Sequence, residues 1–147
     1  MTRVTRSRQR GFTLIEIMVV VVIIGLLTAV VTTQVMGRVD EARVSKVRQD
    51  IRAISAALDL YALDNSRYPT TEQGLAALMV KPTIEPIPPN WNPRGYVRQP
   101  SKDPWKNEYI YRSPGENGEY DIVSLGADGK EGGEGLDADI ASWNLDE

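Results

Sequence analysis

The most prominent feature of the sequence is an uninterrupted apolar stretch near its start. Residues 12–36 are dominated by Val, Ile and Leu, and they carry a single charged side chain, Glu16. As a helix this stretch would be about 37 Å long at roughly 1.5 Å per residue, which is enough for a hydrocarbon core of about 30 Å. We therefore expect residues 12–36 to form a transmembrane helix.

A second apolar pattern follows directly and has helical spacing. Apolar side chains recur every three or four residues, and charged side chains occupy the other face. Because no proline occurs between Phe12 and Tyr68, the pattern predicts one helix from Phe12 to about Asn65, whose second half packs under a globular domain. The apolar stripe consists of Val44, Val47, Ile51, Ile54, Leu58 and Tyr61.

Two further segments follow this helix. Thr70 and Gln73 have the spacing of a capping box, in which each side chain bonds the other residue's backbone N–H, and this predicts a short helix through residues 75–79. Residues 81–95 contain five prolines, a density that excludes regular structure. They predict a stiff surface loop, and the sequence leaves open whether it binds a partner or acts as a spacer.

The C-terminal third predicts a small sheet. Residues 108–112 and 120–124 alternate in the manner of strands and flank a Pro- and Gly-containing turn, which indicates an antiparallel hairpin. Because two strands alone are marginally stable, we expect a third around residues 96–97, and a last helical turn at residues 138–143 with Trp143 packed on the domain. The expected fold class is α+β: a long N-terminal helix packed on a small antiparallel sheet.

Composition narrows the function. The chain has 147 residues, a net charge of −3, and neither cysteine nor histidine. Disulfides, thiol chemistry, a Ser-His-Asp triad and a histidine zinc site are therefore excluded. Four arginines precede residue 11, so the remainder has 13 basic and 20 acidic side chains, a net charge of −7. Such a balance argues against nucleic acid as a partner.

The start of the chain reads as a leader rather than as part of the fold. Its arginines, followed by an apolar span, predict a cytoplasmic N-terminus and an exported C-terminal part. A secretory signal would need a small-residue cleavage site after the apolar run, and residues 28–30 are a poor candidate.

Glu16 allows two interpretations: a charge that reaches headgroups or water, or a carboxylate with a cation partner inside the membrane. Cleavage after Gly11 would create such a cation, the α-amine of Phe12.

The segment from Arg10 to Glu16, with its basic leader and apolar helix, resembles the prepilin-type cleavage site of type IV pilins and their relatives. The resemblance implies cleavage after Gly11, N-methylation of Phe12 and use of Glu16 in subunit assembly. The chain would then consist of a leader peptide at residues 1–11, a transmembrane and assembly helix at residues 12–36, and a periplasmic pilin-like domain at residues 37–147.

A second informative stretch is the acidic, glycine-rich segment 125–139. Calcium prefers six to eight oxygen ligands in flexible geometry, and Asp128, Asp137 and Asp139 are able to close around one ion with backbone carbonyls such as those of Leu125 and Lys130. The segment does not fit the EF-hand pattern, and it contains half of a calcium-binding nonapeptide only once. From the residues alone, a solvated acidic loop explains the pattern equally well.

Motifs spread over the chain resemble the major pseudopilin of the type II secretion system; they are residues 64–75, 103–105, 113–115 and 124–129. The resemblance implies that the late loop binds Ca²⁺ through Asp128, Asp139 and Asp137, with carbonyls of Leu125 and Lys130; the length of the loop varies in the family, which affects the match at Asp137. It implies a non-enzymatic subunit of a Gram-negative bacterium, held in the inner membrane with its domain in the periplasm. The implied partners are the membrane, further copies in a helical filament, minor pseudopilins, the prepilin peptidase, the inner-membrane assembly platform and the secretin, through which the filament drives folded proteins.

Three alternatives remain at this point. A type IV pilin of a surface fibre would share the leader and the helix, but such pilins usually close a C-terminal loop with a disulfide, which this chain lacks the cysteines to form. A membrane-anchored calcium-binding domain without an assembly role would be neither cleaved nor polymerised. An anchored hydrolase using Asp128 and Glu131 is disfavoured, because flexible glycines would not hold the carboxylates in the positions that catalysis requires.

Overall fold

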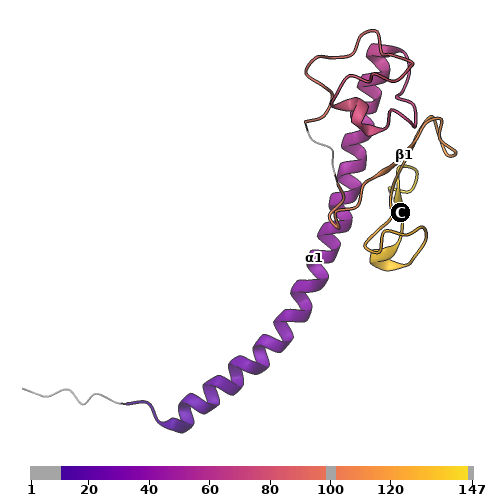
Figure 1. Ribbon diagram of the computed structural model, residues 1–147. Helices are drawn as coiled ribbons and strands as arrows, with labels where there is room; N and C mark the ends of the chain where they lie inside the picture. Colours follow the sequence, from indigo (N-terminus) through magenta and orange to yellow (C-terminus); the bar gives the residue numbers. More distant parts are fainter. Residues whose placement is uncertain (1–10, 99–101, 146–147) are drawn as a thin grey trace, which may run out of the picture. The chain divides into compact units, whose positions relative to one another are not determined.

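The structure is a computed structural model that describes residues 11–98 and 102–145. The chain divides into two units, residues 1–39 and residues 40–147. One helix, α1 (Leu14–Asn65), contributes to both (Figure 1). This confirms the prediction of a single long helix. It begins two residues later than expected, because Thr13 acts as its N-terminal cap.

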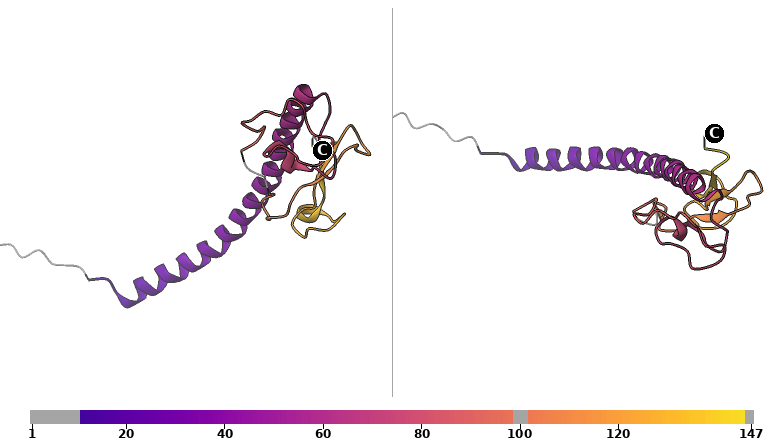
Figure 2. Two further views of the ribbon diagram at one scale, coloured as in Figure 1. Left: turned by 45° about the horizontal axis from the view of Figure 1, so that its top comes forward. Right: turned by 90° about the horizontal axis from the view of Figure 1, so that it is seen from above.

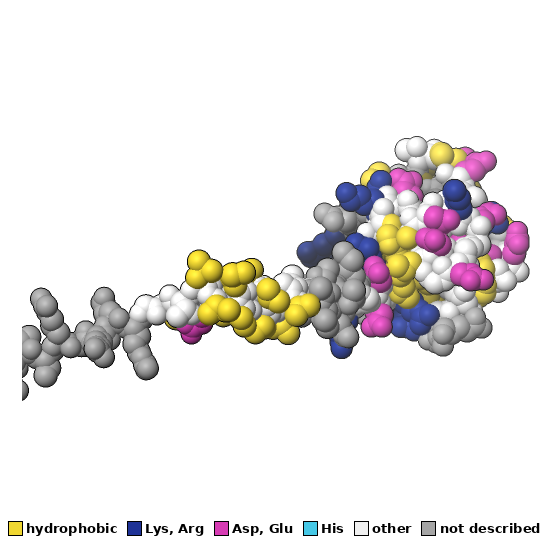
Figure 3. Space-filling model, turned by 90° about the horizontal axis from the view of Figure 1, so that it is seen from below, with side chains coloured by type: hydrophobic (Ala, Val, Ile, Leu, Met, Phe, Trp, Pro, Cys, Tyr) yellow, Lys and Arg dark blue, Asp and Glu magenta, His cyan; other side chains and the backbone are white. Residues whose placement is uncertain are grey.

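In the first unit the described hydrophobic side chains of α1 are exposed. Every large hydrophobic side chain from Leu14 to Leu27 is at least 47% exposed, and Figure 3 shows hydrophobic side chains along the visible face of this part of the helix. Within the described residues, no helix combines the length and the apolar character that crossing a membrane requires. The side chains of residues 29–36, part of the predicted span, lie outside the description, as do residues 1–10 of the predicted leader.

The second unit contains a three-stranded antiparallel sheet of order β1-β2-β3. β1 (Ile110–Arg112) and β2 (Asp121–Ser124) pair as the predicted hairpin. The third strand is β3 (Ile140–Ala141), which pairs with β2. It lies where a helical turn was expected, and that prediction was wrong: both residues of β3 are buried, and Trp143 is 50% exposed rather than packed on the domain.

The third strand expected at residues 96–97 was also wrong. The backbone N–H groups of Tyr96 and Val97 both donate to the carbonyl oxygen of Leu78, at 2.7 and 3.3 Å. The ring of Tyr96 packs against Tyr61, with ring centroids 5.3 Å apart, and also against Trp91. These contacts attach the segment to α1 and to the short 3-10 helix η1 (Leu75–Leu78) instead of to the sheet.

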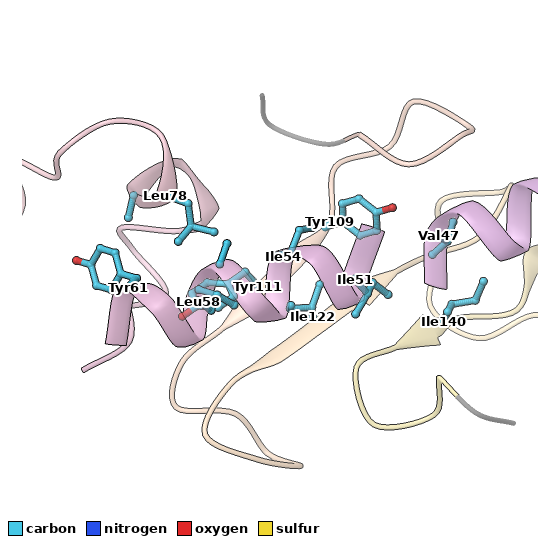
Figure 4. Packing of buried hydrophobic residues seen from close by; sticks show 12 residues of the cluster. Val47, Ile51, Ile54, Leu58, Tyr61, Leu78, Tyr109, Tyr111, Ile122 and Ile140 are labelled. Carbon is cyan, nitrogen blue, oxygen red and sulfur yellow. The ribbon is translucent and has the colours of Figure 1, made fainter. Parts of the chain in front are cut away.

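The core lies between the second half of α1 and the inner face of the sheet. Figure 4 shows the side chains of the α1 stripe directed toward those of the strands and of η1. This confirms that the stripe packs on the domain, although Val44 is only partly buried. The core is formed by Val47, Ile51, Ile54, Leu58 and Tyr61 of α1 with Leu78, Tyr109, Tyr111, Ile122 and Ile140.

The proline-rich segment is ordered by side chains from outside it. The predicted capping box is present: the backbone N–H of Thr70 donates to the side-chain oxygen of Gln73 at 3.0 Å, and the reverse bond is 3.2 Å. Gln73 then donates to the carbonyls of Ile84 and Pro86, and Arg67 donates to those of Pro86 and Ile87. Figure 2 shows this segment beside the end of α1 in both views.

Candidate functional site

The first candidate site is the beginning of α1, where Thr13 and Glu16 form a capping box. The backbone N–H of Glu16 donates to the Thr13 hydroxyl at 3.3 Å, and the backbone N–H of Thr13 donates to the Glu16 carboxylate at 3.4 Å. The box satisfies two of the N–H groups that a helix start leaves without partners. The sequence analysis missed this role, although Thr13 followed three residues later by Glu is its ordinary signal.

Glu16 therefore has a local function that its charge alone did not indicate. The structure places Gly11 and Phe12 directly before this box, and the Phe12 side chain is 78% exposed. Pairing of Glu16 with an amine at Phe12 stays a prediction, as does cleavage after Gly11.

The second candidate site is the acidic loop, which is closed at its base by backbone contacts. The N–H of Ala127 donates to the carbonyl of Leu136 at 2.9 Å. Gly126 has φ +63°, and a Cβ built on it would lie 2.7 Å from the carbonyl carbon and oxygen of Asp137. Only glycine combines this backbone conformation with so close an approach. The two ends of the loop are thus held together by the chain itself, next to the 3-10 helix η2 (Gly135–Asp137).

Asp139 lies inside this loop and has one oxygen without a partner. Its Oδ2 accepts a hydrogen bond from the backbone N–H of Gly132 at 2.9 Å, whereas its Oδ1 is buried and has no hydrogen-bond partner. Asp128 is exposed, and its Oδ1 accepts from the N–H of Lys130 at 3.1 Å. Asp137 is exposed as well. Of the three predicted carboxylates, Asp139 is the one that is partly buried, and the other two are exposed.

The structure does not gather the predicted carboxylates at one point. Within the described residues, no three acidic side chains are close enough to hold a metal ion together. Leu125 and Asp139 instead line one pocket beside the sheet with Glu131, a residue that the sequence analysis left out of the site. Ligation by Asp128, Asp137 and the carbonyl of Lys130 stays a prediction.

The site nevertheless fits the chemistry of a hard cation. The predicted metal ligands are all oxygen atoms. A buried carboxylate oxygen without a partner is costly unless a hydrogen-bond donor or a cation satisfies it. The unpartnered Oδ1 of Asp139 is such an atom. In a calcium complex, Asp139 would be the anchoring ligand, and the glycines around it would allow backbone carbonyls to turn toward the ion.

Comparisons with known proteins agree with these features. The family described as "Type II secretion system (T2SS), protein G" matches residues 34–143, and the prokaryotic N-terminal methylation motif matches residues 6–32. The chain is 58% identical to type II secretion system core protein G of Pseudomonas aeruginosa, covering 95% of this chain and 98% of the relative. It is 53% identical to the protein of the same name from Vibrio cholerae, covering 94% of each chain.

A solved structure shows the same fold. The crystal structure of the major pseudopilin from the type 2 secretion system of enterohaemorrhagic Escherichia coli matches with a TM-score of 0.65 and 47% sequence identity, covering 74% of this chain and 92% of that chain. That match confirms the predicted long helix packed on a small antiparallel sheet. Together with the methylation motif at the start and the protein G match over most of the remainder, it shows that the chain belongs to the type II secretion system protein G family, the major pseudopilins.

Proposed function

We propose that this chain is the major structural subunit of a type II secretion pseudopilus, which polymerises into a periplasmic filament and drives folded proteins through the outer-membrane secretin. The observation that carries the proposal is the first part of α1, whose hydrophobic side chains from Leu14 to Leu27 are exposed on a chain of the protein G family. A helix that is apolar all round is covered either by lipid or by other protein. A subunit with such a helix therefore has two stable surroundings, the bilayer and an assembly.

Before assembly, the subunit is held in the inner membrane by residues 12–36, with residues 37–147 in the periplasm. The prepilin peptidase removes residues 1–11 and methylates Phe12. This supplies an amine at the start of the helix, one turn from Glu16. The methylation motif matched at residues 6–32 supports this processing.

During assembly, the apolar helix exchanges lipid for the helices of other copies. A contact between unlike surfaces that does not close on itself generates a helical fibre. The Glu16 carboxylate pairs with the Phe12 amine of an adjacent subunit, because an unpaired charge is costly in lipid and in a helix bundle alike. The minor pseudopilins, the inner-membrane assembly platform and the secretin are the partners of this fibre.

Calcium has a supporting role in the proposal. The ion binds in the acidic loop through Asp139, assisted by Asp128, Asp137 and the carbonyls of Leu125 and Lys130. Its support is the buried, unpartnered Oδ1 of Asp139. By restricting the loop, the ion gives the domain one fixed surface for contact with other subunits.

The test is the mature N-terminus of protein isolated from its native envelope, measured by mass spectrometry, together with electron microscopy of the isolated material. The expected result is a chain that begins at Phe12 carrying one methyl group, with subunits assembled into fibres. A chain that still begins at Met1 and stays monomeric at all concentrations would contradict the proposal.

A further inference from the structure

The first half of the acidic loop is attached to a turn that lies some twenty residues earlier in the chain. The side-chain amide of Asn107 donates to the carbonyl oxygen of Gly126 at 3.0 Å. Asn107 also lies against Gly129: a Cβ built on Gly129 would be 3.4 Å from the Asn107 side-chain oxygen. Gly126 and Gly129 flank Asp128 in the sequence, so one side chain contacts the loop on both sides of a predicted ligand.

Asn107 is itself held rigidly. Its backbone N–H donates to Oδ1 of Asp103 at 2.7 Å, and its carbonyl accepts from the N–H of Asp103 at 2.9 Å. Asp103 is only 4% exposed, and its Oδ2 accepts from the hydroxyl of Ser124 at 2.9 Å. Ser124 is the last residue of β2, from which the acidic loop departs. A closed set of hydrogen bonds therefore joins the turn, the end of β2 and the loop.

The loop needs such an attachment because its own backbone is unusually free. Gly126 and Gly129 both have positive φ, +63° and +67°, and glycine loses more conformational freedom on becoming ordered than any other residue. An ion that bound an unattached segment would have to order it at the moment of binding, and its affinity would fall accordingly.

We propose that Asn107 is a positioning residue for the calcium site. It fixes residues 126–129, so that the carbonyl of Leu125 and the carboxylate of Asp128 are presented from a defined backbone, and it does not touch the ion itself. The inference rests on the proposed binding of calcium. Asn107 thus holds the first half of the loop, and the bond between Gly132 and Asp139 holds the second half.

The test uses the full mature chain in detergent micelles, titrated with calcium chloride by isothermal calorimetry. Loss of groups that orient metal ligands typically weakens metal affinity roughly 10- to 100-fold, so we expect Asn107→Ala to raise the calcium Kd at least tenfold. Without calcium, in the presence of EDTA, its Tm should stay close to that of the unsubstituted chain. Asn90→Ala is the matched control, because the Asn90 amide donates to the carbonyl of Asp64, outside the acidic loop, and its calcium Kd should be unchanged.

The outcomes separate this inference from the proposal on which it rests. An Asn107→Ala chain that binds calcium as tightly as the unsubstituted chain would overturn the inference alone. So would a variant whose Tm falls in EDTA while its Kd is unchanged, because Asn107 would then stabilise the fold without positioning ligands. An unsubstituted chain that binds no calcium would overturn the calcium proposal and this inference together.

Discussion

The Glu16 side chain has two roles, in the helix cap and in the proposed ion pair, and substitutions can separate them. In the structure it closes a capping box with Thr13, and in the proposed filament its charge pairs with the Phe12 amine of a neighbour. Glutamine serves the third helical position of a capping box as well as glutamate does, but it carries no charge. Glu16→Gln therefore keeps the cap and removes the charge, whereas Glu16→Ala removes both.

The magnitudes of the two roles differ enough to be distinguished. The two hydrogen bonds of the cap are 3.3 and 3.4 Å long, beyond the usual 2.9–3.0 Å for N–H···O bonds, so the cap contributes about 0.5 kcal/mol, the low end of measured values. Removing one partner of a buried ion pair costs about 3 kcal/mol or more, because the other charge stays buried and unpaired. At about 1.4 kcal/mol per factor of ten, this corresponds to roughly a 100-fold loss in the affinity of subunit addition.

The assay is filament yield from the full chain processed by its prepilin peptidase, measured by sedimentation and electron microscopy. Circular dichroism of the same chain in micelles reports helix content. We expect Glu16→Gln to retain helix content and membrane insertion and to lose filaments almost as completely as Glu16→Ala. Thr13→Ala is the matched control, because it removes the hydroxyl of the cap and keeps the carboxylate, and its filament yield should fall about twofold at most.

The reverse pattern would refute the reasoning. If Glu16→Gln assembled like the unsubstituted chain while Thr13→Ala failed, Glu16 would act through the helix start, and no interchain ion pair would be needed. Normal filaments from Glu16→Ala would show that assembly requires neither the cap nor the charge of Glu16.

The remaining predictions concern the second unit, which contains all three tryptophans, so its unfolding is followed by their fluorescence. Burial raises the pKa of Tyr111 from 10.0 to about 12. Because the unfolded chain loses this proton first, the contribution of Tyr111 to the free energy of unfolding should be retained below pH 10 and fall by up to about 1.4 kcal/mol per pH unit between pH 10 and 12. Tyr111→Phe should lower the pH slope of the free energy of unfolding by this amount, and an unchanged slope would contradict the assignment. Leu58→Ala, at a fully buried position of α1, should lower the free energy of unfolding by about 2–5 kcal/mol. Leu63→Ala, at a position 79% exposed, should change it by no more than about 0.5 kcal/mol. Equal losses in the two variants would contradict the packing of the stripe.

The parts of the fold that the sequence predicted depend on neighbours a few residues apart. The stripe of α1 repeats every three or four residues, and the capping box of Thr70 and Gln73 needs only its own spacing. The two strands of the hairpin, β1 and β2, are joined by a turn that its Pro and Gly residues reveal in the sequence. Each of these patterns is local, so the structure that it predicts does not depend on contacts with distant residues.

The two wrong predictions of secondary structure, at residues 96–97 and 138–143, concern segments whose conformation is set by contacts with distant residues. Tyr96 has a strand-forming side chain, yet its N–H donates to Leu78 and its ring packs on Tyr61, contacts that no local pattern announces. β3 has two residues, too few for an alternation to be recognised. Its pairing with β2 is reinforced by the N–H of Ser142, which donates to the carbonyl of Ile122 at 2.9 Å.

The difference between local patterns and distant contacts also applies to the acidic loop. Its composition indicated oxygen ligands, but composition does not say which carboxylate oxygen becomes buried. In the structure this is Oδ1 of Asp139, whose Oδ2 accepts from the N–H of Gly132, seven residues earlier. The contact between Ala127 and Leu136 closes the loop by backbone bonds that involve no ligand carboxylate. The proposed calcium ion therefore would not have to create this loop. Its binding energy would instead restrict the segment between the two closing points, which would otherwise vary from one subunit contact to the next.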